Sequence, residues 1–173
     1  MFPKAFLTAL AALPFITEPA TAQSCLECPS GSVWYVDASS DPGSATGLDW
    51  DHAFPTVNQA ITAASAGDCI WVAAGRYYPS STNNRLDTFF INKSLKLYGG
   101  FDASETCFAD RAGNFSGTRL SGDINTPGHA PDNSYRVITI QGPPAFGQGL
   151  NVVIDGFTIR DAYNNNAAAA SGG

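Results

Sequence analysis

Four aspartates lie close together in a polar stretch near the start of the chain, where they form the first candidate site for chemistry. Asp37, Asp41, Asp49 and Asp51 occur among Ser, Gly and Pro residues. Carboxylates in such an oxygen-rich loop are ligands that Ca²⁺ prefers. Their spacing is not that of an EF-hand loop, and Asp beside Gly or Ser is typical of solvated turns. We therefore expect turn residues and no cofactor here, with calcium as the alternative.

The four cysteines offer a second kind of chemistry, and they are Cys25, Cys28, Cys69 and Cys107. Cys25 and Cys28 have the spacing of a redox or metal pair, but zinc would need two further ligands and no histidine lies near the other cysteines. The export signal described below favours disulfides instead. Three pairings are open. We favour Cys25–Cys28 with Cys69–Cys107, although spacing alone does not fix the connectivity.

Several aromatic residues could stack on sugar rings, namely Trp34, Trp71, Tyr77, Tyr78 and Tyr98. Aromatic residues of short apolar runs are more often part of the core, and the apolar neighbours of Trp71 favour that position. His52 and His129 lie in polar segments far apart in the sequence, so no Ser-His-Asp arrangement can be recognised.

The start of the chain, residues 1–22, has the pattern of an export signal. Lys4 precedes an apolar run over residues 5–16, and Ala20-Thr21-Ala22 is a small-x-small cleavage signature. The run is shorter than the roughly 20 residues that span a bilayer. We expect a protein that is secreted or on the cell surface, with no transmembrane span in the mature chain. Lipoprotein anchoring at Cys25 is the weaker alternative, because residues 22–24 match a lipid-attachment box poorly.

Composition indicates a folded, acidic domain. The hydrophobic fraction is 44% and the formal net charge is -6, values that disfavour disorder and give no basic surface for nucleic acid. We therefore expect no nucleic-acid partner and a monomer in solution.

Short apolar runs recur along the mature chain, over residues 69–75, 94–100, 118–123, 135–142 and 151–159. The step along the chain from Val72 to Leu95 equals the step from Leu97 to Leu120. Recurrence every ~20–25 residues is typical of a solenoid, whereas sandwich strands recur every ~8–12 residues in hairpins. The pattern predicts strands that stack in parallel, coil upon coil.

One amphipathic helix is expected, over residues 54–64. Its apolar stripe consists of Phe54, Val57, Ile61 and Ala64. Pro55 suits the first helical position and Gly67 follows the end of the helix. Because a stack of strands exposes its end, we expect this face to cap the N-terminal end of the coils.

Several motifs together resemble exported bacterial proteins of the pectin-lyase-like group. They lie in residues 34–37, 54–61, 66–77, 95–101, 120–124, 133–137 and 153–159. The resemblance covers nearly all of the mature chain. It implies an all-β fold, a right-handed single-stranded parallel β-helix with one N-terminal capping helix. Relatives usually continue with a Gly-rich segment and further coils, so we expect a truncated chain.

This resemblance also divides the chain into parts. Residues 1–22 are the signal, 23–66 the N-terminal strand, loop and capping helix, 67–162 the coils, and 163–173 a small-residue tail. The group includes polysaccharide lyases, glycosidases, adhesins and surface proteins, so its motifs indicate a fold better than an activity.

Lyases of this group use a basic side chain to remove a proton beside a uronate carboxylate, often with calcium bound to carboxylates. The outward basic candidates here are Lys96, Arg119, Arg136 and Arg160, and the carboxylates near strand ends are Asp102, Asp123, Asp155 and Asp161. Outward residues of alternating strands are polar in any case, and Asp beside Gly is usual in turns. We therefore expect a non-catalytic scaffold for surface display, adhesion or glycan contact. A polysaccharide lyase or glycosidase acting on acidic polysaccharide is the alternative, with active coils partly missing from this chain.

Overall fold

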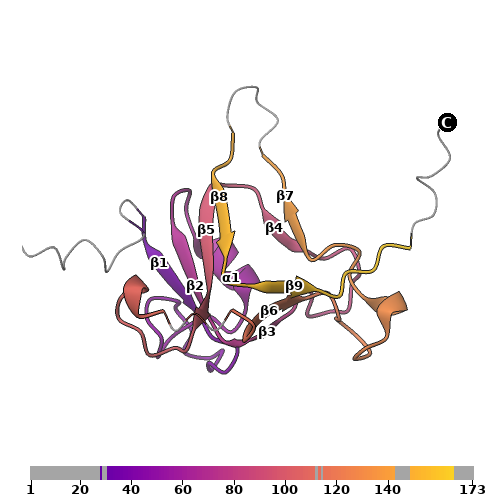
Figure 1. Ribbon diagram of the computed structural model, residues 1–173, viewed down its shortest axis with the longest axis horizontal. Coiled ribbons are helices and arrows are strands. Elements are labelled where there is room, and N and C mark those ends of the chain that lie inside the picture. Colours follow the sequence, from indigo (N-terminus) through magenta and orange to yellow (C-terminus); the bar gives the residue numbers. More distant parts are fainter. Residues whose placement is uncertain (1–27, 29–30, 112, 114, 143–148, 166–173) are drawn as a thin grey trace, which may run out of the picture.

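The computed structural model describes residues 28, 31–111, 113, 115–142 and 149–165 (Figure 1). The predicted export signal, Cys25 and residues 166–173 lie outside these ranges. The elements within them are β1 Val33–Val36, α1 Val57–Ala63, β2 Cys69–Ala73, β3 Gly75–Tyr77, β4 Phe89–Ile91, β5 Leu95–Phe101, η1 Phe108–Asp110, β6 Thr118–Ser121, η2 Ala130–Asp132, β7 Ile138–Ile140, β8 Val152–Asp155 and β9 Thr158–Arg160.

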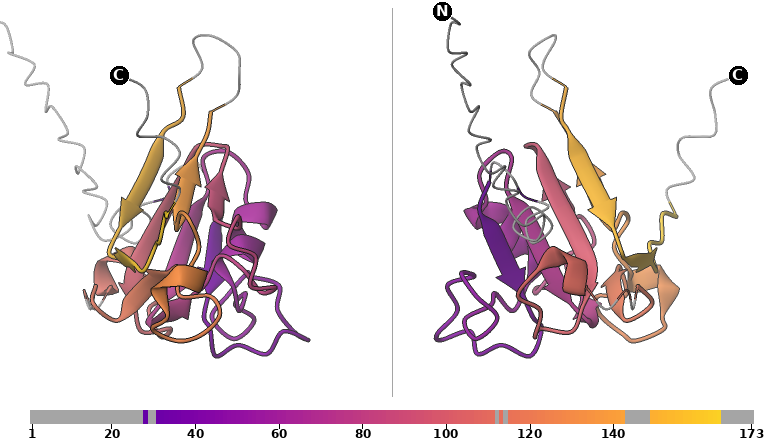
Figure 2. Two further views of the ribbon diagram at one scale, coloured as in Figure 1. Left: turned by 90° about the vertical axis from the view of Figure 1, so that its right-hand side faces the viewer. Right: turned by 60° about the vertical axis from the view of Figure 1, so that its left-hand side comes forward.

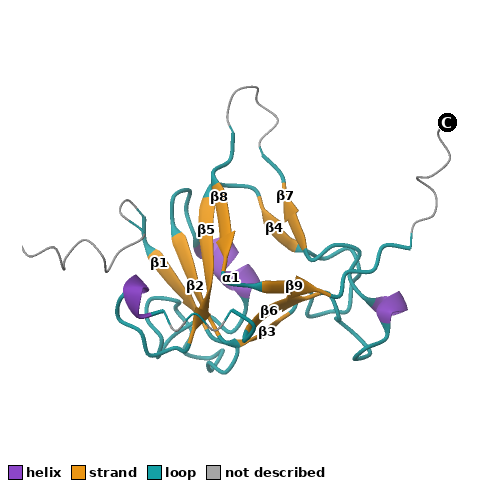
Figure 3. Ribbon diagram, viewed as in Figure 1, coloured by secondary structure: helices purple, strands orange, loops and turns teal. Residues whose placement is uncertain are grey.

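The strands form three short parallel sheets (Figure 3). The strand orders are β1-β2-β5-β8, β3-β6-β9 and β4-β7. From β2 onward the chain visits the three sheets in turn before it returns to the first, and each new strand pairs in parallel with one from the previous pass. Figure 2 shows β1 and β8 at the opposite edges of the first sheet. Parallel pairing, predicted from the sequence, is confirmed.

The register of the strands corrects the predicted spacing. Leu97 pairs with Ile70 on one side and with Ile154 on the other. The sequence separation between Leu97 and Ile154 is much larger than that between Ile70 and Leu97. Leu120 belongs to a different sheet, where it pairs with Tyr77. The step from Leu97 to Leu120 therefore does not connect equivalent positions, because the passes differ in loop length.

Both faces of the first sheet are covered, which explains why all five residues of β2 are buried. Ile70 and Val72 face the main core between the sheets. Cys69 and Trp71 face the other way, into a second cluster with Tyr98 and Phe101. A strand buried on both sides has a nearly continuous apolar sequence rather than an alternating one.

The helix α1 begins one turn later than its sequence suggests. Thr56 is the N-cap, and its hydroxyl oxygen accepts a hydrogen bond from the backbone N–H of Gln59 at 3.3 Å. Pro55 therefore precedes the cap instead of occupying the first helical position. Val57, Ile61 and Ala64 are buried in the main core, with Phe54 partly buried against it. The helix packs against β4, β1 and β2. No helix in the described part of the chain is long and apolar enough to cross a membrane.

Close approach of the backbone between passes requires glycine at some positions. Gly156 has φ +80°, and a Cβ added to Gly99 would lie 2.4 Å from the carbonyl oxygen of Gly156. The backbone of β5 at Gly99 and the turn at Gly156 therefore approach more closely than any larger residue at position 99 would permit.

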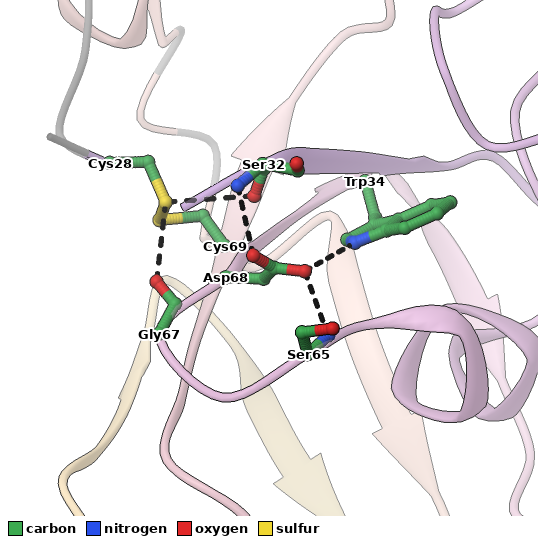
Figure 4. Close-up of a disulfide and its surroundings, with 7 residues drawn as sticks. All are labelled: Cys28, Ser32, Trp34, Ser65, Gly67, Asp68 and Cys69. Carbon is green, nitrogen blue, oxygen red and sulfur yellow. Dashed lines mark hydrogen bonds between the residues drawn. A yellow bond between two sulfur atoms is a disulfide. The ribbon is translucent and has the colours of Figure 1, made fainter. Parts of the chain in front are cut away.

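The carboxylate of Asp68 connects the helix exit to the first two strands (Figure 4). It accepts hydrogen bonds from the backbone N–H of Ser32 at 2.9 Å, the indole N–H of Trp34 at 2.9 Å and the backbone N–H of Ser65 at 2.8 Å. Only 6% of Asp68 is exposed. Burial alone would raise the pKa of this carboxyl group. The three hydrogen bonds and the charge of Lys93 outweigh that effect and hold the pKa below its ordinary value.

A disulfide beside Asp68 joins Cys28 to Cys69, with 6.0 Å between the Cα atoms. Our favoured pairing, Cys25–Cys28 with Cys69–Cys107, was therefore wrong. The parallel alignment of β1 and β2 brings the residues before β1 next to the start of β2, which places Cys28 against Cys69. Cys107 is also disulfide-bonded. The Cys28–Cys69 bond closes 41 residues of sequence, a constraint on the unfolded chain worth about 4 kcal/mol in the loop-entropy account.

The inward-facing rows of side chains end on exposed aliphatic residues. Leu120 is fully buried, whereas its Cα partner Ile159 is 48% exposed. Ile140 is 51% exposed above buried Ile91. Ile140 and Ile159, with Val137, Ile138 and Ile154, line an open apolar hollow at the edge formed by β7, β8 and β9.

Truncation of two residues in the same row should therefore have unequal effects. We expect Leu120→Ala to lower the free energy of unfolding by about 3 kcal/mol, because it removes buried methyl groups and leaves a cavity. Ile159→Ala should cost less than about 1 kcal/mol, because half of that side chain already contacts solvent. Urea titration followed by tryptophan fluorescence measures both, and equal losses would contradict this description of the exposed edge.

The Asp68 carboxylate should contribute stability that depends on pH. Its folded-state pKa is depressed, so its contribution is complete above about pH 5 and is lost as the pH falls through that folded value. We expect Asp68→Asn to cost about 1–3 kcal/mol near neutral pH. The difference from the unmodified protein should shrink below about pH 4. Denaturant titrations of both proteins across this range isolate Asp68, since the other aspartates titrate in both. A difference that stays constant with pH would refute the assignment.

Candidate functional site

A groove of about 1070 Å³ opens between α1, the connection from β3 to β4, and the outer face of β4. Asn58 and Thr62 contribute to its wall from α1, Tyr78 from the residue after β3, and Phe90 from β4. A concave site of this size is large enough for a small ligand or a few units of a polymer.

Local sequence places two aromatic rings in this groove. In β4, Phe89 and Ile91 are buried, so alternation turns Phe90 outward, where it is 42% exposed. Tyr77 is buried and its hydroxyl donates to the carbonyl oxygen of Ala73 at 3.0 Å. The next residue, Tyr78, is 40% exposed. Two half-exposed rings in one groove offer apolar faces of the kind that sugar rings contact.

Polar side chains hold the walls of the groove in place. The side-chain amide of Asn58 donates to the carbonyl oxygen of Pro79 at 2.8 Å, which connects α1 to the β3–β4 segment. The Ser80 hydroxyl donates to Asp87 at 2.6 Å, and the Asn84 amide donates to the same carboxylate at 2.9 Å. These bonds fix the shape of the connection, from which Ser81 and Thr82 also line the groove.

The basic residues considered for a lyase do not share one face. Lys96 lies on β5 in the first sheet, and Arg119 and Arg160 lie on β6 and β9 in the second. Arg136 lies between η2 and β7 and is exposed. Arg119 donates to the carbonyl oxygen of Ser116 at 3.1 Å.

The carboxylates considered with them are mostly engaged with near neighbours. Asp155 pairs with Arg111 at 2.6 Å, and Asp161 pairs with Arg160 at 2.9 Å. Asp102 accepts hydrogen bonds from Ser104, and Asp123 accepts one from the backbone N–H of Gly128 at 3.0 Å.

The aspartates considered for calcium make separate local turns. Asp37 accepts from the backbone N–H and hydroxyl of Ser39, and Asp41 from the backbone N–H of Gly43. Asp49 accepts from His52 at 2.8 Å, and that hydrogen bond lowers the pKa of Asp49. Asp51 is exposed in the same segment. Among the residues that the structure describes, no three His, Cys, Asp or Glu side chains lie close enough to hold a metal ion.

The aromatic residues singled out in the sequence take different roles. Trp71 is 1% exposed and stacks on Phe101, with ring centroids 4.7 Å apart. Tyr98 is buried in the same cluster. Trp34 is partly buried and bonded to Asp68. Tyr77 and Tyr78 both line the groove, and of these two Tyr77 is buried and Tyr78 is half-exposed.

Sequence reasoning did not identify Asn58 or Phe90. A period-two pattern in Phe89-Phe90-Ile91 would have been the signal for Phe90, but three residues are too few to establish alternation.

No protein-family model matches this chain, and no curated protein or solved structure matches it significantly. The chemistry of the groove is therefore inferred from its own residues.

Proposed function

We propose that the chain is a right-handed parallel β-helix of the pectin-lyase-like kind. The order in which the strands visit the three sheets supports this fold, because one complete pass through the sheets corresponds to one coil. The position of α1 supports a capping role. It packs against β1 and β4, which are the terminal strands of their sheets on the N-terminal side.

We further propose that the protein is exported. The predicted signal over residues 1–22 is one support. The Cys28–Cys69 disulfide is a second, because disulfides persist mainly in oxidising compartments.

Within this fold we propose a non-catalytic scaffold that contacts glycans through the groove at α1. The observation that carries the proposal is the pair of half-exposed rings, Tyr78 and Phe90, in a groove whose lining also includes hydroxyl and amide side chains. Sugars present apolar C–H faces beside hydroxyl groups, and this lining complements both.

A lyase is the less favoured activity. It would need a base to converge with carboxylates on one substrate. The four basic candidates instead occupy two sheets and a loop, and Arg160 is paired with its neighbour Asp161.

The proposal can be tested by glycan binding. Purified mature protein should bind members of a glycan array, and the double variant Tyr78→Ala/Phe90→Ala should bind at least about fivefold more weakly, since each ring is worth about 0.5–1.5 kcal/mol and the two together about 1–3 kcal/mol. Phe115→Ala is the matched control, because Phe115 is an aromatic residue of similar exposure, 45%, that does not line the groove. Its binding should match that of the unmodified protein.

Two results would overturn this assignment. One is the absence of binding across the array, or binding that survives loss of both rings. The other is the release of unsaturated products, seen as ultraviolet absorbance, when the protein is incubated with acidic polysaccharides and calcium, which would establish a lyase instead.

A further inference from the structure

We infer that Arg85 positions one wall of the groove at α1 without lining the groove itself. This inference rests on the proposed glycan contact and names a positioning residue for that site. Arg85 belongs to the connection from β3 to β4, over residues 78–88, but it is not one of the residues that line the groove. The three residues that follow it, Leu86, Asp87 and Thr88, do line the groove.

The Arg85 side chain contacts parts of the chain that come later in the sequence. Its Nε–H donates to the carbonyl oxygen of Asn133 at 2.7 Å, and its Nη2 donates to the carbonyl oxygen of Tyr163 at 3.0 Å. The guanidinium carbon lies 4.1 Å from the ring centroid of Tyr135, and Nη1 donates to the hydroxyl of that residue at 3.3 Å. One wall of the groove is thus attached to the segment before β7 and to the segment after β9.

An arginine suits this set of contacts better than a lysine. Its planar guanidinium carries five N–H donors in a fixed fork and also stacks on aromatic rings. Two carbonyl oxygens and one ring can therefore be engaged by a single side chain. Hydrogen bonds from a charged donor are stronger than those between neutral groups, and those to Asn133 and Tyr135 are partly buried.

The other attachments of the connection lie near its two ends or on its exposed surface. The helix α1 holds the connection at Pro79, the Thr88 hydroxyl bonds to the backbone just before β7 at 3.0 Å, and the Asn83 amide makes one exposed bond at 3.1 Å. The backbone carbonyl of Arg85 accepts a hydrogen bond from the N–H of Tyr135 at 2.9 Å. Main chain and side chain of Arg85 therefore provide the partly buried anchor between Pro79 and Thr88.

Hydrogen bonds inside the connection extend this anchoring to the groove. Asp87 accepts from the Ser80 hydroxyl and the Asn84 amide, and the Ser80 oxygen accepts from the backbone N–H of Asn84 at 3.1 Å. Ser80 and Asp87 both line the groove. A wall that is ordered before a glycan binds loses less conformational entropy on binding than a mobile wall does. Loss of the Arg85 side chain should therefore weaken binding even though the groove keeps all its lining residues.

Replacement of Arg85 tests this role. Arg85→Ala should weaken binding of the array glycan that the unmodified protein binds most tightly by at least about fivefold, a difference of about 1 kcal/mol. Amide hydrogen exchange in residues 80–88 of the unliganded protein, followed by mass spectrometry, should become at least about threefold faster, because the wall opens more often. Arg85→Lys should give intermediate values of both, since an ammonium group can replace only part of the contacts.

Arg111→Ala is the matched control. The Arg111 side chain is 11% exposed and pairs with Asp155 at 2.6 Å. Its guanidinium lies 5.1 Å from the ring centroid of Phe108, and Arg111 does not line the groove. Its loss should lower the free energy of unfolding, as the loss of Arg85 should, yet leave glycan binding and exchange in residues 80–88 unchanged.

The outcomes separate this inference from the proposed function. Unchanged exchange in residues 80–88 of Arg85→Ala would overturn the positioning role, and so would faster exchange without any loss of affinity. An equal loss of affinity in Arg111→Ala would also overturn it, because binding would then follow overall stability. Absence of glycan binding by the unmodified protein would instead overturn the proposed function and, with it, the effect of Arg85 on affinity.

Discussion

The buried carboxylate of Asp68 is the interaction on which the arrangement of the first elements depends. It satisfies backbone donors from the chain before β1 and after α1, together with the indole of Trp34 on β1. All three bonds are partly buried, and a hydrogen bond to a charged group contributes about 1.5–3 kcal/mol. Because Asp68 immediately precedes β2, the same contacts align β1 with β2 in parallel register. The adjacent Cys28–Cys69 bond makes that alignment covalent.

Coverage of the first sheet on both faces determines where a ligand can bind. A sheet of regular strands can offer a long flat face to a ligand. The outer face of this sheet is instead filled by Trp71, Tyr98 and Phe101, with Trp50 and Phe108 packed over them. Arg111 adds a further layer, with its guanidinium 5.1 Å from the ring centroid of Phe108 and paired with Asp155. Trp71 and Tyr98, two of the aromatic residues that the sequence offered for stacking on sugars, are thus buried by packing.

Local patterns in the sequence predicted the helix and the longer strands. They did not predict contacts between residues that are far apart in the sequence. The three- and four-residue spacing of Val57, Ile61 and Ala64 identified the helix because those residues share a face. The strands β2 and β5 are continuous or alternating runs long enough to recognise. The strands β3 and β4 have three residues each, too short for periodicity to be read. The disulfide pairing was missed because it follows from the adjacency of β1 and β2, which no local spacing encodes.

The groove shows why a site of this kind is hard to find from sequence. Its walls come from α1, the residues after β3 and the outer face of β4, and they meet only because α1 packs beside the first strand of the third sheet. The Asn58–Pro79 hydrogen bond spans 21 residues of sequence, and neither residue carries a recognisable motif. A helix that closed the end of the stack with flush walls would leave no hollow. Here α1 and the β3–β4 connection both line a groove, so the element that covers the core also forms one wall of that groove. Covering the core and binding a ligand would therefore be two consequences of the same helix placement.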